Sequence, residues 1–240
     1  MTRFSSRVRR TVRRLALLCA AILVVVFVAA PAATLLALRW LPPPTTAFMV
    51  QKRIAAWWAD ERDPFRYRWV AWERISPHAR LAAVAAEDQN FPRHHGFDVQ
   101  AIEKAWEAHE RGGKLRGAST ITQQVAKNLF LTPHRTFARK GLEAWFTVLI
   151  EWLWPKRRIL EIYLNIAEFG PGVFGVREAS ARYFEKPPDR LTEHEAAILA
   201  AVLPNPLRLH ADRPSAYVLR RANWIEGQMR QLGRDYLTKL

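Results

Sequence analysis

The N-terminal part of the chain changes abruptly from basic to apolar. Six arginines lie between Arg3 and Arg14, and an uncharged run of 24 residues follows from residue 15 to residue 38. As a helix this run would measure roughly 36 Å, enough to cross a bilayer core. We expect residues 1–14 to be a cytoplasmic basic segment and residues 15–38 a single transmembrane anchor. The alternative is a cleaved signal peptide cut near Ala33, although secretory apolar cores are usually shorter.

Residues 39–75 differ in pattern from the segments on either side. Three consecutive prolines, Pro42 to Pro44, predict an extended spacer. The segment continues with Trp57, Trp58, Trp69 and Trp72 and with Arg66, Arg68 and Arg74. This mixture fits a bilayer interface and also fits ordinary core aromatics. We expect residues 39–75 to be a periplasmic linker and membrane-proximal segment.

From Ser76 onward the apolar positions follow helical periodicity. Ser76 and Pro77 have the types found at an N-cap and at the first helical position, and predict a helix to about Asp88. Asp98 would cap a second helix. Further helices are expected over about 120–130, 137–154 and 156–166, after a capping box at Thr192, and after Pro214. Alternating strand patterns are scarce, and the glycines from Gly170 to Gly175 predict a turn. Residues 76–240 therefore read as one mainly α domain.

Composition narrows the class of protein. The 240 residues are 50% hydrophobic with ten tryptophans, which excludes intrinsic disorder. The net charge of +15 is partly an N-terminal effect, because residues 1–59 carry nine basic residues and no acid. The remainder has a net charge of only +6, so no nucleic-acid partner is expected. The single cysteine, Cys19, excludes a disulfide framework and a cysteine-rich zinc site, and no metal ligands are assigned.

The first segment with candidate chemistry ends the helix that begins at Pro77. An alanine-rich stretch leads into two consecutive acids, Glu87 and Asp88. A carboxylate held against an apolar wall has a raised pKa, which suits a general acid or base near neutral pH. An ordinary acidic pair at a helix end is the alternative.

Two further segments carry an unusual choice of polar residues. On a helix, Ile121, Val125 and Leu129 would form an apolar stripe, opposite a face of Thr120, Gln123, Gln124 and Lys127. Uncharged Thr and Gln suit a face that hydrogen-bonds a polyhydroxylated ligand.

The third segment runs from Arg135 to Glu143. Arg139 and Lys140 are spaced to pair with Glu143 on a helix. Such pairs form either a surface salt-bridge ladder or, together with Lys127, a cationic cradle for a phosphate or pyrophosphate.

At these segments the chain resembles a known family. The patterns Glu87-Asp88-x-x-Phe91-x-x-His94-x-Gly96, Gly117-x-Ser119-Thr120-Ile121-Thr122-Gln123-Gln124 and Arg139-Lys140-x-x-Glu143 resemble signatures of the peptidoglycan glycosyltransferases. Segments 156–165 and 175–184 resemble further ones, so the similarity extends over about residues 76–206. A short tail without transpeptidase motifs resembles the monofunctional biosynthetic transglycosylases of this family.

The resemblance implies a fold and roles for individual residues. It implies a lysozyme-like helical domain with Glu87 as general base, Asp88 as its supporting acid and Glu143 on the pyrophosphate side. Asn90 and Leu142 stand where some relatives carry a basic residue, so neither receives a phosphate role. The implied substrate-binding residues are Ser119, Thr120, Gln123, Gln124, Lys127, Asn128, Arg135, Arg139, Lys140, Phe91, His94 and Gly96.

The resemblance also implies a reaction and a location. The enzyme would polymerise lipid II by inverting transfer from an undecaprenyl-pyrophosphate-linked donor, in the inner membrane with a periplasmic catalytic domain. Its partners would be lipid II, the growing lipid-linked strand, the membrane, and proteins of cell-wall synthesis and division. No cofactor is required by the sequence, and relatives suggest Mg²⁺ or Mn²⁺. One alternative is a lysozyme-like hydrolase or lytic transglycosylase, which needs no cationic cradle. The other is a non-enzymatic membrane-tethered scaffold or polyanion-binding module, which the uncharged Thr/Gln face opposes.

Overall fold

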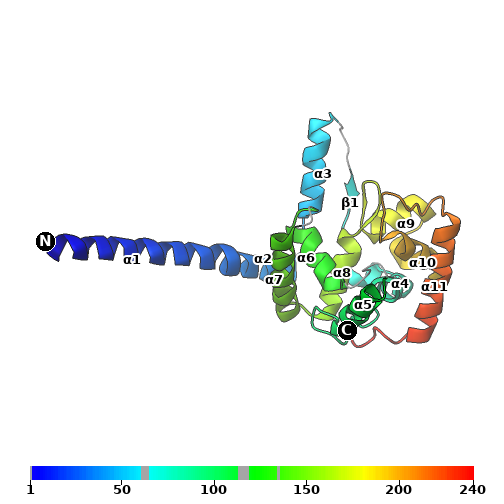
Figure 1. Cartoon of the computed structure of the whole chain (residues 1–240). Coiled ribbons are helices and arrows are strands. Elements are labelled where there is room, and N and C mark those ends of the chain that lie inside the picture. Colours follow the sequence, from blue (N-terminus) through cyan, green and yellow to red (C-terminus); the bar gives the residue numbers. More distant parts are fainter. Residues whose placement is uncertain (1, 61–64, 113–118, 134–135) are drawn as a thin grey trace. The chain divides into compact units, whose positions relative to one another are not determined.

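The computed structural model describes residues 2–60, 65–112, 119–133 and 136–240. The chain divides into two compact units, Met1–Leu41 and Pro42–Leu240 (Figure 1). The first unit is helical throughout the predicted apolar run, in the order α1 (Thr2–Val24), a π-helical turn η1 (Val25–Ala29) and α2 (Ala30–Leu38). Pro31 lies in the first turn of α2, directly after the π-helical turn, and Ala29 before it has helical dihedral angles (φ −67°, ψ −48°). Among the described residues, no individual helix combines the length and the apolar character that a membrane span requires.

The second unit is mainly helical, as the sequence predicts. Its helices are α3 (Ala47–Trp58), α4 (Pro77–Glu87), α5 (Val99–Glu110), α6 (Ile121–Phe130), α7 (Phe137–Leu153), α8 (Lys156–Ile166), α9 (Val176–Phe184), α10 (Glu193–Val202) and α11 (Ala216–Leu232). Two short 3-10 helices, η2 (Trp72–Arg74) and η3 (Pro188–Arg190), complete the set.

The predicted helix starts are confirmed by their caps. The Ser76 hydroxyl accepts a hydrogen bond from the backbone N–H of His78 (3.2 Å), and the Asp98 carboxylate accepts one from that of Ala101 (2.9 Å). Thr192 forms the predicted capping box, and Thr120 forms another at the start of α6. Local side-chain chemistry therefore fixes where these helices begin.

The segment that was expected to be a linker contains regular structure. α3 is capped by Thr46, and β1 (Arg66–Tyr67) pairs in parallel with β3 (Val173–Phe174). β2 (Glu168–Gly170) completes a three-stranded sheet in the order β1-β3-β2. Strands of two or three residues are too short to show an alternating pattern, and for this reason the sequence did not reveal them. The predicted turn is confirmed between β2 and β3, where Gly172 has φ +71°.

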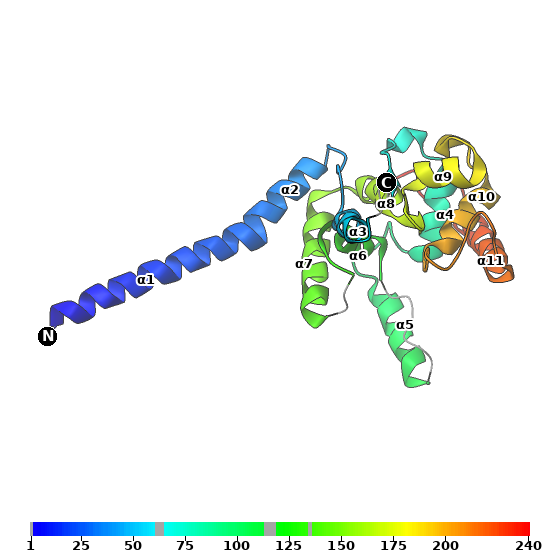
Figure 2. The same cartoon turned by 90° about the horizontal axis from the view of Figure 1, so that it is seen from above.

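The helices of the second unit form two groups on either side of α8. α4, α10 and α11 pack together in one group, and α3, α6 and α7 lie in the other (Figures 1 and 2). α8 contacts both α4 and α6, and its residues Ile159, Leu160 and Ile162 are fully buried. The C-terminal end of α4 thereby meets α6 at the junction of the two groups.

Candidate functional site

A cavity of about 610 Å³ opens between α6 and the start of α7. We call it the basic cavity, because three cations, Lys127, Arg139 and Lys140, line it together with one carboxylate, Glu143. Its remaining described lining is Phe48, Ser119, Gln123, Gln124, Pro133, Thr136 and Phe137. The polar face predicted on α6 and the cluster predicted on α7 thus border one hollow.

Glu143 organises the cations of the basic cavity. Arg139 donates from Nη1 to one carboxylate oxygen at 2.7 Å, and the Lys140 ammonium contacts the other. The predicted spacing of these pairs is confirmed, but Glu143 is only 3% exposed, unlike a member of a surface ladder. The Nε of Arg139 is buried and has no hydrogen-bond partner among the described residues.

Lys127 connects the basic cavity with the end of α4. Burial lowers the pKa of the Lys127 ammonium. The negative charges of Glu143 and Glu87 raise this pKa, and the positive charges of Arg139 and Lys140 lower it further. The ammonium therefore lies in the electrostatic field of both carboxylates.

Glu87 lies at the last position of α4 and faces three elements. Gln124 of α6 donates from Nε2 to Glu87 Oε2 at 2.9 Å, and Nη2 of Arg221 lies 3.6 Å from Oε1. Tyr163 of α8 donates to Gln124 Oε1 (3.4 Å), which agrees with an orientation of the amide that presents its NH₂ group to Glu87. Burial raises the pKa of Glu87, and the hydrogen bond from Gln124 and the charges of Arg221 and Lys127 oppose this effect. The group meets the requirement for a general base at neutral pH.

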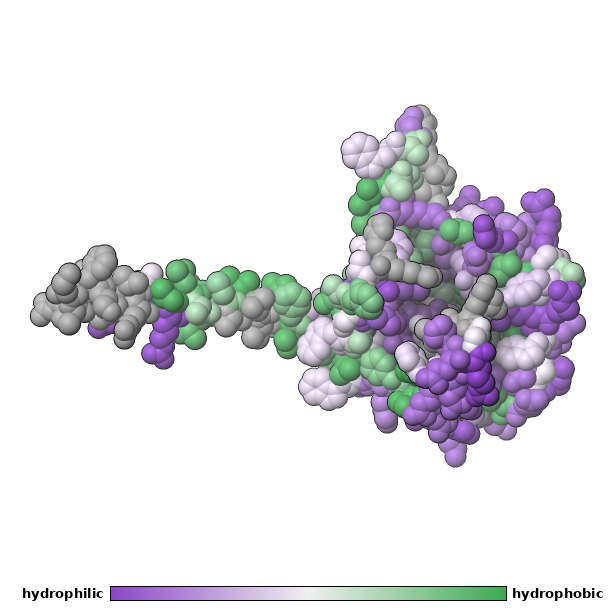
Figure 3. All heavy atoms as spheres, in the orientation of Figure 1, coloured by the Kyte–Doolittle hydropathy of each residue, from purple (hydrophilic) through white to green (hydrophobic). Residues whose placement is uncertain are grey.

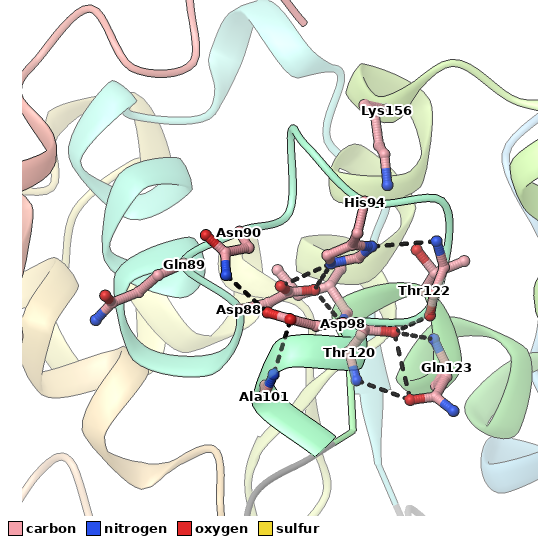
Figure 4. A network of polar contacts seen from close by, with 12 residues as sticks. Asp88, Gln89, Asn90, His94, Asp98, Ala101, Thr120, Thr122, Gln123 and Lys156 are labelled. Atoms are coloured by element: carbon pink, nitrogen blue, oxygen red, sulfur yellow. Dashed lines mark hydrogen bonds and ion pairs between the residues drawn. The ribbon is translucent and has the colours of Figure 1, made fainter. Parts of the chain in front are cut away.

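Asp88, the next residue, points into the protein (Figure 4). Its carboxylate lies 2.8 and 3.0 Å from Nε2 of His94 and accepts a hydrogen bond from the backbone N–H of Ile121 at 2.9 Å. The N–H of Gly96 donates to Nδ1 of His94 (3.1 Å), so the ring proton lies on Nε2 and is donated to Asp88. Asp88 therefore joins the end of α4 to the start of α6.

Phe91, His94 and Gly96, implied as substrate-binding residues, lie in the framework behind the site. Phe91 is fully buried beneath the ammonium of Lys156, and none of the three belongs to the described lining of the basic cavity. Gly96 has φ +87°, and a Cβ there would lie 2.7 Å from Thr147 Cγ2. Its carbonyl accepts a hydrogen bond from the Thr120 hydroxyl at 2.7 Å.

The other implied substrate-binding residues lie in different surroundings. Ser119, Gln123, Gln124, Lys127, Arg139 and Lys140 line the basic cavity, and Thr120 is buried as the cap of α6. Asn128 borders a smaller hollow of about 170 Å³ beside Tyr163 and Phe174. Arg135 lies outside the described residues.

Comparison with known proteins assigns the chain to a family. Residues 52–230 match the family model described as Transglycosylase. The chain belongs to the transglycosylase family. A protein of Pseudomonas entomophila named Biosynthetic peptidoglycan transglycosylase is 53% identical over 204 residues, covering 85% of this chain and 86% of the relative. Proteins of the same name from Cronobacter sakazakii (56% over 199 residues, 81% of each chain) and Pseudomonas aeruginosa (51% over 204 residues, 85% and 88%) are similar as well.

The carboxylates of this transglycosylase do not fit a protein-held divalent cation at the basic cavity. Glu143 is the one carboxylate in its described lining, and both of its oxygens are paired with cations. No group of three His, Cys, Asp or Glu residues in the described part of the chain could hold a metal ion.

Sequence reasoning missed one residue that the transglycosylase fold brings to Glu87. Arg221 lies on α11, far along the chain from the three candidate segments. Its Nη2 lies 3.5 Å from the backbone oxygen of Ala86, and its Nε is buried without a partner among the described residues. The sequence offers no signal for it, because Arg220 and Arg230 on the same helix look equivalent.

Replacing Arg221 by Met is expected to move the acidic limb of the pH–rate profile to higher pH. Arg221 lowers the pKa of Glu87, so removing this cation should raise that pKa further. The groups that still face Glu87 are Gln124 and Lys127 of α6, Tyr163 of α8 and the neighbouring Asp88. A larger fraction of the base is then protonated near neutral pH, and kcat/KM falls there. The profile would be measured between about pH 5 and pH 9.

Two variants control for the Arg221 prediction. Arg221→Lys keeps the positive charge and should restore part of the profile, whereas Arg220→Met removes an exposed arginine and should leave it in place. A uniform loss of rate in Arg221→Met with an unmoved acidic limb would contradict the predicted effect on Glu87.

Proposed function

We propose that this transglycosylase polymerises peptidoglycan glycan strands from lipid II. The relatives are named biosynthetic peptidoglycan transglycosylases, which supports this reading. The observation that carries the proposal is the placement of a largely desolvated carboxylate, with a raised pKa, next to a cavity lined by cations. Glu87 supplies the base, and the basic cavity supplies the positive charge that an anionic leaving group requires.

The proposed reaction is a direct displacement. Glu87 removes the proton from the acceptor hydroxyl, whose oxygen forms the new bond to the anomeric carbon of the donor. The bond from that carbon to the lipid pyrophosphate breaks, the configuration inverts, and the pyrophosphate leaves with the bonding electrons. Lys127, Arg139 and Lys140 stabilise the negative charge that develops on it. Glu143 holds the two cations of α7 in place.

A lysozyme-like hydrolase fits the arrangement less well. A retaining glycosidase needs a second carboxylate that is free to attack or stabilise the sugar. Asp88 is buried, and its oxygens are held by His94 and by the backbone of α6. A hydrolase also has no use for three cations at the leaving-group side. Incubation of the purified protein with lipid II, followed by separation of products by length, tests the proposal; free disaccharide without longer strands would favour the hydrolase.

We also propose that residues 15–38 anchor the enzyme in the inner membrane with the catalytic domain in the periplasm. The arginines before this run favour a cytoplasmic N-terminus. Within the second unit, large apolar side chains are exposed on the outer faces of α3 and α7 (Figure 3). These are Val50, Ile54, Trp57 and Trp58 on α3, and Leu142, Trp145, Val148 and Trp152 on α7. Contact of these faces with lipid would keep the site close to its lipid-linked substrates.

A protein that begins near Thr45 is expected to fold and to retain activity on lipid II in detergent, but to work less well on lipid II in vesicles. An anchor confines enzyme and substrate to one surface and raises their local concentration. Rates in the two media, compared with those of the full-length protein, measure this effect. Equal vesicle rates, a native N-terminus near Ala33, or release from membranes by high salt would each contradict the anchor.

A further inference from the structure

A second cavity of about 240 Å³ lies against Glu87. We call it the Trp224 cavity, after the aromatic residue that α11 contributes to its wall. Ser119 lines both this cavity and the basic cavity, but among the described lining residues Glu87 belongs only to the Trp224 cavity. The carboxyl group that acts as base is therefore reached from this side. The remaining described lining is Ala85, Ala86, Asp88, Gln89, Asn90, Asp98, Ala101 and Thr120.

Trp224 stands on the face of α11 that is turned toward the end of α4. Arg221, Trp224 and Gln228 follow the spacing that places side chains on one side of a helix. Arg221 approaches Glu87, and Gln228 accepts a hydrogen bond from Gln89 Nε2 at 3.0 Å. Trp224 is 48% exposed, so the core does not account for its large apolar surface.

The polar lining of the Trp224 cavity is held in position by hydrogen bonds. Gln89 also donates from Nε2 to the carbonyl of Ala85 (3.1 Å), and Asn90 donates from Nδ2 to Asp98 Oδ2 (2.9 Å; Figure 4). These bonds use the NH₂ groups and leave the amide oxygens of Gln89 and Asn90 as acceptors toward a ligand. The amides are thus oriented before any ligand arrives.

The charge of the Trp224 cavity distinguishes it from the basic cavity. Its described lining holds no lysine or arginine, and contains the carboxyl groups of Glu87, Asp88 and Asp98. Phosphate or carboxylate would be repelled there. An aromatic surface beside planar amides and hydroxyls suits a neutral ring with hydroxyl donors, which is a saccharide.

We propose that the Trp224 cavity is a saccharide subsite, in which the indole of Trp224 packs against the sugar ring whose hydroxyl is presented to Glu87. The ring hydroxyls donate to the amide oxygens of Gln89 and Asn90. This inference rests on the proposed function, because it assigns the sugar of the acceptor to one side of Glu87 and the donor pyrophosphate to the other. It makes Trp224 a residue that determines acceptor affinity.

The test compares Trp224→Ala, Trp224→Phe and Tyr217→Ala in the full-length protein. Tyr217 is the matched control, since it is an exposed aromatic residue on the same helix that is absent from the described lining. For Trp224→Ala we expect KM for lipid II to rise about tenfold, the loss of one stacked aromatic contact, while kcat changes much less. Trp224→Phe should lie between the wild type and the alanine variant, and Tyr217→Ala should match the wild type.

A binding measurement separates the subsite from catalysis. Calorimetric titration of a lipid-free GlcNAc–MurNAc oligosaccharide into a Glu87→Gln protein should give a dissociation constant that Trp224→Ala weakens by about tenfold. Equal KM values and equal oligosaccharide affinities in Trp224→Ala and Tyr217→Ala would overturn the subsite, even though the wild type polymerises lipid II. A parallel fall of kcat and thermal midpoint, with unchanged affinity, would show a structural role and also overturn it. A wild type that binds the oligosaccharide without polymerising lipid II would contradict the proposed function instead.

Discussion

Glu87→Gln should keep the fold and lower the rate of strand polymerisation by about 10²–10⁴-fold, the usual cost of losing a general base. Glutamine has nearly the same shape and can still accept a hydrogen bond from Gln124, but it cannot take up a proton. The measurement is single-turnover polymerisation of lipid II at neutral pH, with circular dichroism as a check on folding. Turnover near that of the wild type would contradict the assignment of the base.

The same variant carries an expectation for stability. Burial raises the pKa of Glu87 in the folded protein, so the ionised form costs the folded state free energy at neutral pH. A carboxyl group with a raised pKa favours folding below its unfolded pKa, and this contribution is lost as the pH rises through the folded pKa. Glutamine never ionises, so Glu87→Gln should unfold at the same temperature as the wild type or higher at neutral pH. A marked drop in the unfolding temperature would show that any loss of activity has a structural cause.

Lys127→Ala, Arg139→Ala and Lys140→Ala should each lower the polymerisation rate by about 10²-fold, the scale for removing one group that stabilises developing charge. All three line the basic cavity, where the pyrophosphate is expected to leave. Steady-state rates with lipid II would be compared with those of Arg230→Ala.

Arg230 is a suitable control for the three cations. Its side chain is 64% exposed on α11, and its contacts to Glu193 and Glu226, at 3.5 and 3.7 Å, are surface ion pairs of little energetic value. If all three cavity variants polymerise like Arg230→Ala, the cations of the basic cavity serve only solubility.

The helices were predictable from sequence because their signals are local. Ser76, Asp98, Thr120 and Thr192 each cap a helix within three residues along the chain. The ion pairs of Glu143 were equally accessible, since helical spacing alone places Arg139 and Lys140 beside it. That these residues line a cavity could not be predicted in the same way. It depends on the packing of α7 against α6, which buries Glu143 and which no local pattern encodes.

Other features depend on contacts between distant parts of the chain. β1 pairs with β3 more than 100 residues later, and each strand is too short for its own periodicity. The resemblance implies a substrate-binding role for His94 and Gly96, but no local pattern reveals that His94 contacts Asp88 or that Gly96 lies close to Thr147. Arg221 and Trp224 reach Glu87 only because α11 packs beside α4.

Lys127 interacts electrostatically with both Glu87 and Glu143. It therefore couples the proposed proton removal to the proposed departure of the pyrophosphate. An anion bound in the basic cavity offsets the field of Lys127, which otherwise lowers the pKa of Glu87. Occupancy by a pyrophosphate therefore makes Glu87 a stronger base, and departure of the pyrophosphate makes it weaker again. By reciprocity, protonation of Glu87 strengthens the hold of the cavity on an anion. On the proposed assignment, Glu87 is therefore most basic when a donor is loaded, which coordinates proton removal with the presence of a strand to extend.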